Sequence, residues 1–154
     1  MLFRSFAFDS YRRFLQMYGD VVLGVSRQDF EHLLKAKRLT SGARSDAELD
    51  ESALRNLVEE YKSLIRRATG REFPMDVQEQ LWGAIVAVWK SWMLKKAVDY
   101  RRANAIPESL GTAVNIMTMV YGNMGNDSGT GVAFTRDPST GRSEERRVGK
   151  ECRL

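Results

Sequence analysis

The chain has 154 residues, which corresponds to one domain by length, and a formal net charge of +4 from 24 Lys and Arg against 20 Asp and Glu. Its 43% apolar and 29% charged residues are typical of a soluble globular protein, and no apolar run approaches the ~18 residues of a membrane span. A single Cys excludes disulfide-stapled folds and Cys-based zinc sites. Residues 1–8 lack the features of a signal peptide. We therefore expect a cytoplasmic domain without membrane contact, whose charge hints at an anionic partner.

Residues 6–106 are predicted to form a helical subdomain of about four to five helices. Apolar side chains recur at three- and four-residue spacing between Tyr11 and Val22, which indicates a helix with one apolar face. Ser26 is placed to cap a second helix, and Asp50 begins a third. Gly70 fits the position after the end of that third helix.

A further helix is predicted to begin at Asp76, which forms a capping-box pattern with Glu79. It continues or kinks near Ser91, and Pro107 marks its latest end. Its tryptophans share one apolar face, and we expect them to pack in a core rather than to stack on bases; they are Trp82, Trp89 and Trp92.

Residues 107–141 are predicted to be a β-hairpin segment. β-Branched and apolar residues in 112–121 and 130–136 favour two strands, and the glycine-rich stretch 122–129 favours a loop between them. Because two strands alone do not form a stable sheet, the hairpin is expected to belong to a larger one. The fold class is thus predicted as α+β.

The usual signatures of a catalytic or metal site do not appear in the sequence. The glycines of 122–131 match neither a dinucleotide fingerprint nor a P-loop, so we interpret them as a hairpin loop. His32 has no nearby Cys or His and is interpreted as a solvated or partly packed side chain. From the residues alone we therefore predict no catalytic residue and no metal ligand.

Three arginine doublets leave a second hypothesis open, that of a small helical module that binds nucleic acid or protein. They are Arg12-Arg13, Arg66-Arg67 and Arg101-Arg102. Acidic residues surround each doublet, so solvated faces or domain contacts are favoured over nucleic-acid binding.

Three stretches resemble the pyruvate, phosphate dikinase family in order and spacing. They are FAFDSYRRFLQMYGDVV (6–22), DYRR (99–102) just before Ile106-Pro107, and GTAVNIMTMVYGNMGNDSGTGVAFTRDPSTG (111–141). The resemblance covers residues 6–141. It implies an incomplete ATP-grasp-type nucleotide-binding domain, in which 6–106 is the helical subdomain and 107–141 the hairpin segment of the ATP-binding lobe.

Enzymes of this family are phosphotransferases that convert ATP, phosphate and pyruvate to phosphoenolpyruvate, AMP and diphosphate through a phosphohistidine. The resemblance therefore implies ATP and Mg²⁺ as cofactors, phosphohistidine and pyruvate-binding domains in the same parent chain, a homodimer, and no nucleic-acid partner. The magnesium ligands and the phosphohistidine would lie outside this sequence. We accordingly expect residues 6–141 to be inactive alone.

The resemblance also implies which residues contact the nucleotide. The strand before the loop would line the adenine side of the ATP cleft, with backbone groups at the adenine edge and apolar side chains at its face. The implied contacts are Met117, Thr118, Met119 and Val120. The family often has Gln at position 117, and Met cannot make the amide hydrogen bonds of that Gln.

Residues 142–154 differ from the family and from the rest of the chain. The letters RSEERRVGKEC, 142–152, resemble the translation of a sequencing-adapter read-through. We therefore predict an artefactual or disordered tail. Without 142–154 the net charge falls to +2, from 19 basic and 17 acidic residues, because five basic and three acidic residues leave with it.

Overall fold

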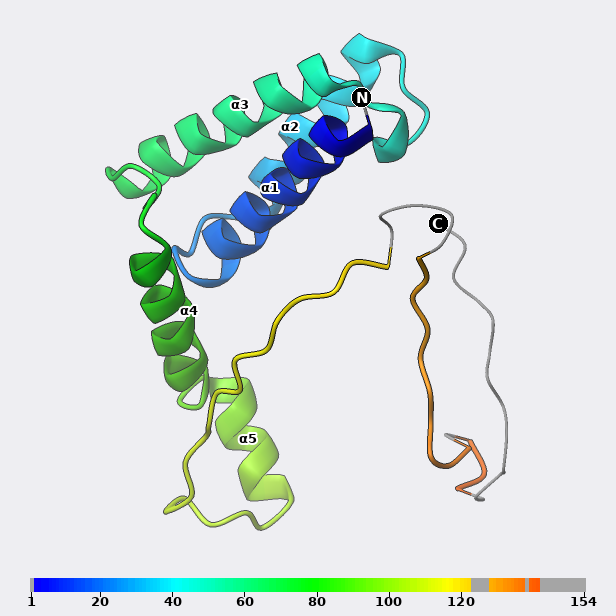
Figure 1. The fold of residues 1–154 in the computed structure, drawn as a ribbon. Helices are drawn as coiled ribbons and strands as arrows, with labels where there is room; N and C mark the ends of the chain where they lie inside the picture. Colours follow the sequence, from blue (N-terminus) through cyan, green and yellow to red (C-terminus); the bar gives the residue numbers. More distant parts are fainter. Residues whose placement is uncertain (1, 123–127, 138, 142–154) are drawn as a thin grey trace. The chain divides into compact units, whose positions relative to one another are not determined.

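The computed structural model describes residues 2–122, 128–137 and 139–141, with side chains from residue 5 onward. The chain divides into two compact units, Met1–Asn115 and Ile116–Leu154, which are described separately. Figure 1 shows the helices of the first unit. They are α1 (Leu2–Val21), α2 (Arg27–Ser41), the short 3-10 helix η1 (Asp46–Glu48), α3 (Glu51–Thr69), α4 (Val77–Ser91) and α5 (Lys95–Ala103).

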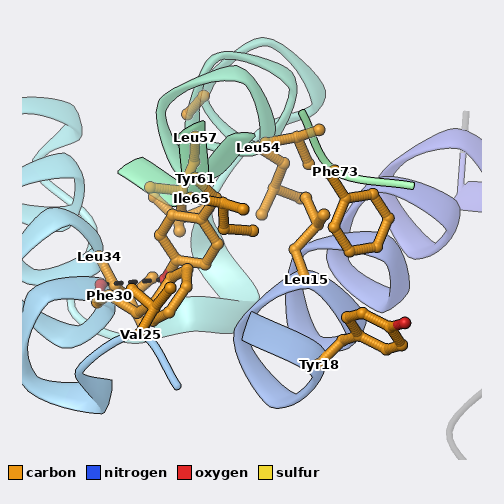
Figure 2. Close-up of a cluster of buried hydrophobic side chains, with 13 residues drawn as sticks. Leu15, Tyr18, Val25, Phe30, Leu34, Leu54, Leu57, Tyr61, Ile65 and Phe73 are labelled. Atoms are coloured by element: carbon orange, nitrogen blue, oxygen red, sulfur yellow. Dashed lines mark hydrogen bonds between the residues drawn. The ribbon is translucent and has the colours of Figure 1, made fainter. Parts of the chain in front are cut away.

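Helices α1, α2 and α3 pack together around a closed apolar core, with α3 against both of the others. Figure 2 shows this core, whose members from the three helices are Leu15, Tyr18, Phe30, Leu34, Ala53, Leu54, Leu57, Val58, Tyr61 and Ile65, joined by Val25, Leu49 and Phe73 from the connections. At its centre the rings of Phe30 and Tyr61 meet edge to face, 4.9 Å between centroids, and the Tyr61 hydroxyl donates to the Phe30 carbonyl oxygen at 3.1 Å. The buried polar atom is thereby satisfied.

Two local features fit the predicted helix boundaries. Asp50 caps α3 as expected, since its Oδ1 accepts from the Ala53 backbone N–H at 2.7 Å. Gly70 ends α3 in the left-handed conformation, at φ +70°. Ser26 precedes α2 as predicted, but its hydroxyl makes no capping bond. Within α1, Gly19 allows close approach of α2, because a Cβ there would lie 2.5 Å from Phe30 Cζ.

Helix α4 touches α1 near Gly83, where an added Cβ would collide with the Tyr18 hydroxyl. The expected core packing of the tryptophans is not seen: Trp82 is 57% and Trp89 48% exposed, and no residue of α4 is fully buried. Residues 81–89 carry no charge, so α4 is apolar nearly all round. A helix of that kind is usual inside a larger protein. No helix in the described part of the chain is both long and apolar enough to cross a membrane.

The prediction of an α+β fragment with a β-hairpin is wrong for this chain. The described residues of 107–141 contain no strand, and the regular elements of the described chain are all helices, the last of which ends at Ala103. Apolar side chains that a sheet would bury are exposed, for example Ile116 at 66% and Phe134 at 66%. The physical reason is that β-propensity alone does not hold two strands together without further strands or a helix to pack on. The central loop residues 123–127, Pro138 and the tail 142–154 lie outside the described residues.

Candidate functional site

The four residues predicted to contact adenine lie in an irregular segment of the second unit. Their side chains are exposed, Met117 at 84%, Met119 at 68% and Val120 at 89%. No hydrogen bond joins Met117–Val120 to another described residue. Apolar side chains and main-chain groups that no described residue bonds therefore lie next to one another in this segment.

The chain approaches itself closely after this segment. A Cβ on Gly122 would lie 2.6 Å from the Gly129 carbonyl oxygen, and would also meet the Thr130 hydroxyl. Only glycine fits at such a backbone approach without displacing its neighbours. Gly122 and Gly129 thus lie side by side, whereas most of the stretch predicted as the hairpin loop, residues 123–127, lies outside the described residues.

A second turn, at Asp137, is held by its own side chain. Asp137 Oδ1 accepts from the backbone N–H groups of Ser139 and Thr140, both at 2.8 Å. These bonds favour the carboxylate and lower the pKa of Asp137. One oxygen of this carboxylate is therefore used by the turn. No group of three or more His, Cys, Asp and Glu side chains is placed to hold a metal among the described residues.

The arginine doublets differ in their surroundings. Arg12 is 3% exposed; its Nη2 lies 2.5 Å from Asp9 Oδ1 and 3.8 Å from Asp46 Oδ2. Arg13 pairs with the other Asp9 oxygen at 2.9 Å. Burial opposes the charge of Arg12, but the hydrogen bond and charge of Asp9 outweigh it and the pKa of Arg12 is raised. Arg12 thus joins α1 to η1, whereas Arg13 is 57% exposed and pairs within α1.

Arg101 is the second buried arginine, at 5% exposed, and sequence reasoning missed it. Its Nη1 donates to the Trp92 carbonyl oxygen at 2.6 Å, and its Cζ lies 4.1 Å from the centre of the Trp92 ring. Its Nε is buried without a hydrogen-bond partner. A pocket of about 620 Å³ adjoins it, lined by Ser91, Trp92, Leu94, Lys96, Ala97, Tyr100, Arg101 and Ile106. The sequence feature that could have indicated this burial is Trp92 at the predicted kink, nine residues before Arg101 and therefore able to pack on it across the turn.

Comparison with known proteins assigns the family. Residues 73–149 match the sequence model described as "Pyruvate phosphate dikinase, AMP/ATP-binding domain". The chain is 51% identical over 139 residues to the pyruvate, phosphate dikinase of Rhizobium meliloti (strain 1021). The aligned residues cover 90% of this chain and 16% of the relative. It is 50% identical over 137 residues to the pyruvate, phosphate dikinase of Clostridium symbiosum, and this alignment covers 88% of the chain and 16% of that relative. The chloroplastic pyruvate, phosphate dikinase of Mesembryanthemum crystallinum is 52% identical over 136 residues, and this alignment covers 88% of the chain and 14% of that relative.

The chain thus spans about a sixth of the length of these curated relatives. The family match begins at Phe73, at the edge of the bundle core, and includes α4, α5 and the segment with Met117–Val120. With this match and about half of its residues identical to those of the relatives, the chain belongs to the pyruvate phosphate dikinase family and lies in the region of its AMP/ATP-binding domain.

Proposed function

We propose that residues 6–141 supply part of the nucleotide-binding domain of a cytoplasmic, homodimeric pyruvate, phosphate dikinase. The parent enzyme would convert ATP, phosphate and pyruvate to AMP, diphosphate and phosphoenolpyruvate. The ATP β-phosphoryl group would pass to a histidine of another domain and then to pyruvate. The observation that carries the proposal is the 51% identity over 139 residues, which includes the nucleotide-binding region.

Within that domain we assign Met117–Val120 to the adenine of ATP. Backbone N–H and C=O groups would pair with the adenine edge, and the exposed side chains of Met117, Met119 and Val120 would cover the ring. The support is the family match, since the residues that match the AMP/ATP-binding domain, 73–149, include this segment. These residues bind and orient the nucleotide; they do not take part in bond breaking.

Mg²⁺ would neutralise the phosphates during phosphoryl transfer in the parent enzyme. The described residues do not fit a magnesium site, because no group of three or more His, Cys, Asp and Glu side chains among them is placed to hold a metal. As the family resemblance implies, we place the magnesium ligands outside this chain and assign it no part in metal binding.

The test is a chimera in which residues 6–141 replace the matched segment of the Rhizobium meliloti enzyme. We expect it to form phosphoenolpyruvate from pyruvate, ATP and phosphate, with AMP as a second product. A folded chimera that neither binds ATP nor forms AMP would refute the proposal. The isolated chain should show no micromolar affinity for Mg²⁺–ATP in calorimetry, because most of the site lies elsewhere.

Three substitutions in the chimera test the adenine assignment. Val120→Pro removes one backbone N–H and should raise the KM for ATP about tenfold, since a lost hydrogen bond to a buried partner costs about 1–3 kcal/mol. Val120→Ile keeps the N–H and serves as the matched control. Met117→Gln adds an amide that can bond to adenine and should lower the KM for ATP. The KM for pyruvate should stay constant in all three.

A further inference from the structure

The pocket beside Arg101, called here the α4–α5 pocket, is apolar and open to solvent. Its lining residues are those given above, and nearly all of the lining atoms are apolar. Two of these residues are largely exposed, Leu94 at 62% and Tyr100 at 63%. Single apolar side chains are common on protein surfaces, but a cavity of about 620 Å³ formed by several of them is typical of a binding surface.

The chain after α5 turns back to complete this pocket. Ala105 adopts the left-handed conformation at φ +51°, and it is the only non-glycine residue with positive φ in the described part of the chain. The next residue, Ile106, donates its N–H to the Arg101 carbonyl oxygen at 2.9 Å and lines the pocket. On the other side of α5, the Leu94 N–H donates to the Ser91 oxygen at 3.2 Å. The α4–α5 pocket is therefore held by hydrogen-bonded turns at both ends of one helix.

Helix α4, which leads into the pocket, carries further apolar surface without a partner. The rings of Trp82 and Trp89 contact each other, with centroids 6.3 Å apart, and both are about half exposed. No residue between them is charged. Because exposed aromatic rings of this size lose favourable burial, the α4–α5 region has the composition of a surface that another segment covers.

The cations of the pocket have no acidic partner among the described residues. Arg101 is 5% exposed and Lys96 lines the pocket, yet neither forms an ion pair there, whereas the neighbouring Lys95 pairs with Asp99 at 2.6 Å. Arg101 donates to the Trp92 oxygen, and its Nε has no hydrogen-bond partner. A cation in an apolar setting is costly unless it is paired. A carboxylate that entered this pocket would therefore meet two cations that lack a counter-charge.

The remainder of a longer polypeptide fits this surface better than a second copy of the chain. The chain spans about a sixth of the length of its relatives, so under the proposed function most of the dikinase lies outside it. A segment of the same polypeptide is present at an effective concentration of about millimolar. A symmetric contact between two copies would instead bring Lys96 and Arg101 of both copies together and leave them unpaired.

We propose that the α4–α5 pocket docks an apolar segment that carries a carboxylate and belongs to the parent dikinase outside this chain. The apolar side chains of the segment would fill the pocket, and its carboxylate would face Lys96 and Arg101. This inference rests on the proposed function, in which the chain is part of a longer dikinase. It does not require that ATP be bound.

The first test measures how fast a thiol in the pocket reacts with a maleimide. Leu94→Cys is made in the 154-residue chain and in the chimera, and labelling is followed on the peptide that contains residue 94 by mass spectrometry. We expect labelling at least about tenfold slower in the chimera, because the docked segment must open first. The matched control is Leu39→Cys on α2, which is 74% exposed and outside the pocket; it should react equally fast in both proteins.

Three outcomes of this measurement would overturn the proposal. The first is equal labelling of Leu94→Cys in the chain and in the chimera. The second is equal slowing at Leu94→Cys and Leu39→Cys, which would show general protection instead of docking at the pocket. The third is protection in the 154-residue chain that increases with its concentration, which would assign the pocket to a second copy.

The second test examines the carboxylate. Lys96→Glu, added to the Leu94→Cys chimera, should speed labelling at least about threefold, since it replaces an attraction at the edge of the pocket by a repulsion. Lys35→Glu makes the same change at an exposed position of α2 and should leave labelling unchanged. Unchanged labelling in Lys96→Glu, or an equal effect of Lys35→Glu, would refute the carboxylate and with it the proposal.

The third test identifies the docked segment directly. Tyr100 of the chimera is replaced by the photoreactive p-benzoylphenylalanine, and the cross-linked peptides are sequenced. We expect a cross-link within one polypeptide, to a peptide outside residues 6–141 that contains Asp or Glu. A cross-link only between subunits, or none, would overturn the proposal. A folded chimera that lacks ATP binding but gives this cross-link would refute the proposed function alone, and an active chimera without the cross-link would refute the docking alone.

Discussion

The bundle of α1–α3 and the helix α4 contain similar apolar side chains but bury them very differently. Leu15, Phe30 and Leu57 in the bundle are 0% exposed, whereas Trp82 and Trp89 in α4 are 57% and 48% exposed. The bundle helices are more buried because the apolar faces of three helices meet in one core. Three helices close a core, while α4 is apolar nearly all round and touches α1 at its Gly83 side. Burial is decided by what surrounds a helix, not by its composition.

The sharpest contrast is expected between truncation of a bundle residue and truncation of an α4 residue. Phe30→Ala should lower the free energy of unfolding by about 3–5 kcal/mol, because it leaves a cavity at the centre of the core. Trp82→Ala, which removes a larger ring, should change it by less than about 0.5 kcal/mol in the same chain. Urea denaturation followed by circular dichroism measures both. A large loss from Trp82→Ala would show that α4 belongs to the same cooperative core.

The buried ion pair of the bundle should contribute more than an exposed one. Asp9→Asn removes the charge that faces Arg12 at 2.5 Å and should cost about 2–3 kcal/mol, since a buried guanidinium would keep only the more distant Asp46. Glu59→Gln breaks a pair with Lys62 in which Glu59 is 67% exposed, and should cost under about 0.5 kcal/mol. Similar losses for the two variants would contradict the buried status of Arg12.

The pH dependence of stability should report on Tyr61, the buried phenol of the core. Burial raises the pKa of Tyr61 from 10.0 to about 12, because the charged form is poorly solvated there. A group with a raised pKa contributes stability that is complete below pH 10 and is lost as the pH rises from 10 to about 12. The expected loss is on the order of 2 kcal/mol. Tyr61→Phe should remove most of this pH dependence, and an unchanged profile in that variant would assign it to other groups.

The smallest expected loss of stability comes from the N-cap residues of α2 and α3, Ser26 and Asp50, which look equally suited to capping in the sequence. Asp50→Ala should cost about 1 kcal/mol, because Asp50 accepts from the Ala53 N–H at 2.7 Å at the start of α3. Ser26→Ala should be nearly neutral, since the Ser26 hydroxyl makes no capping bond to α2. Equal losses in thermal unfolding would mean that Ser26 caps α2 in solution.

The helices of the bundle were predictable because local signals and packing agree there. The spacing from Tyr11 to Val22, the cap at Asp50 and the glycine at position 70 each indicate what the structure contains. The break between α4 and α5 was placed only loosely, near Ser91, because no glycine or proline lies there. Leu94 occupies the N-cap position of α5, and leucine is a poor capping residue that gives no signal.

Two features needed more than local sequence. The strands predicted in 112–121 and 130–136 rested on β-propensity, which reflects packing on neighbours that the described chain does not supply. The burial of Arg101 was hidden because an arginine doublet beside acidic residues resembles a solvated face. The adenine contacts Met117–Val120 came from the family resemblance and stay a prediction, as does the interpretation of residues 142–154 as translated adapter.

The left-handed conformation of Ala105 limits which residues can replace it. A single base change converts an alanine codon to that of glycine, aspartate, valine, threonine or proline, among others. Glycine and aspartate accept a φ of +51°, whereas β-branched valine and threonine are strongly disfavoured and proline is excluded. Random point mutations at this codon should therefore survive selection in a pattern set by backbone geometry and unrelated to side-chain polarity.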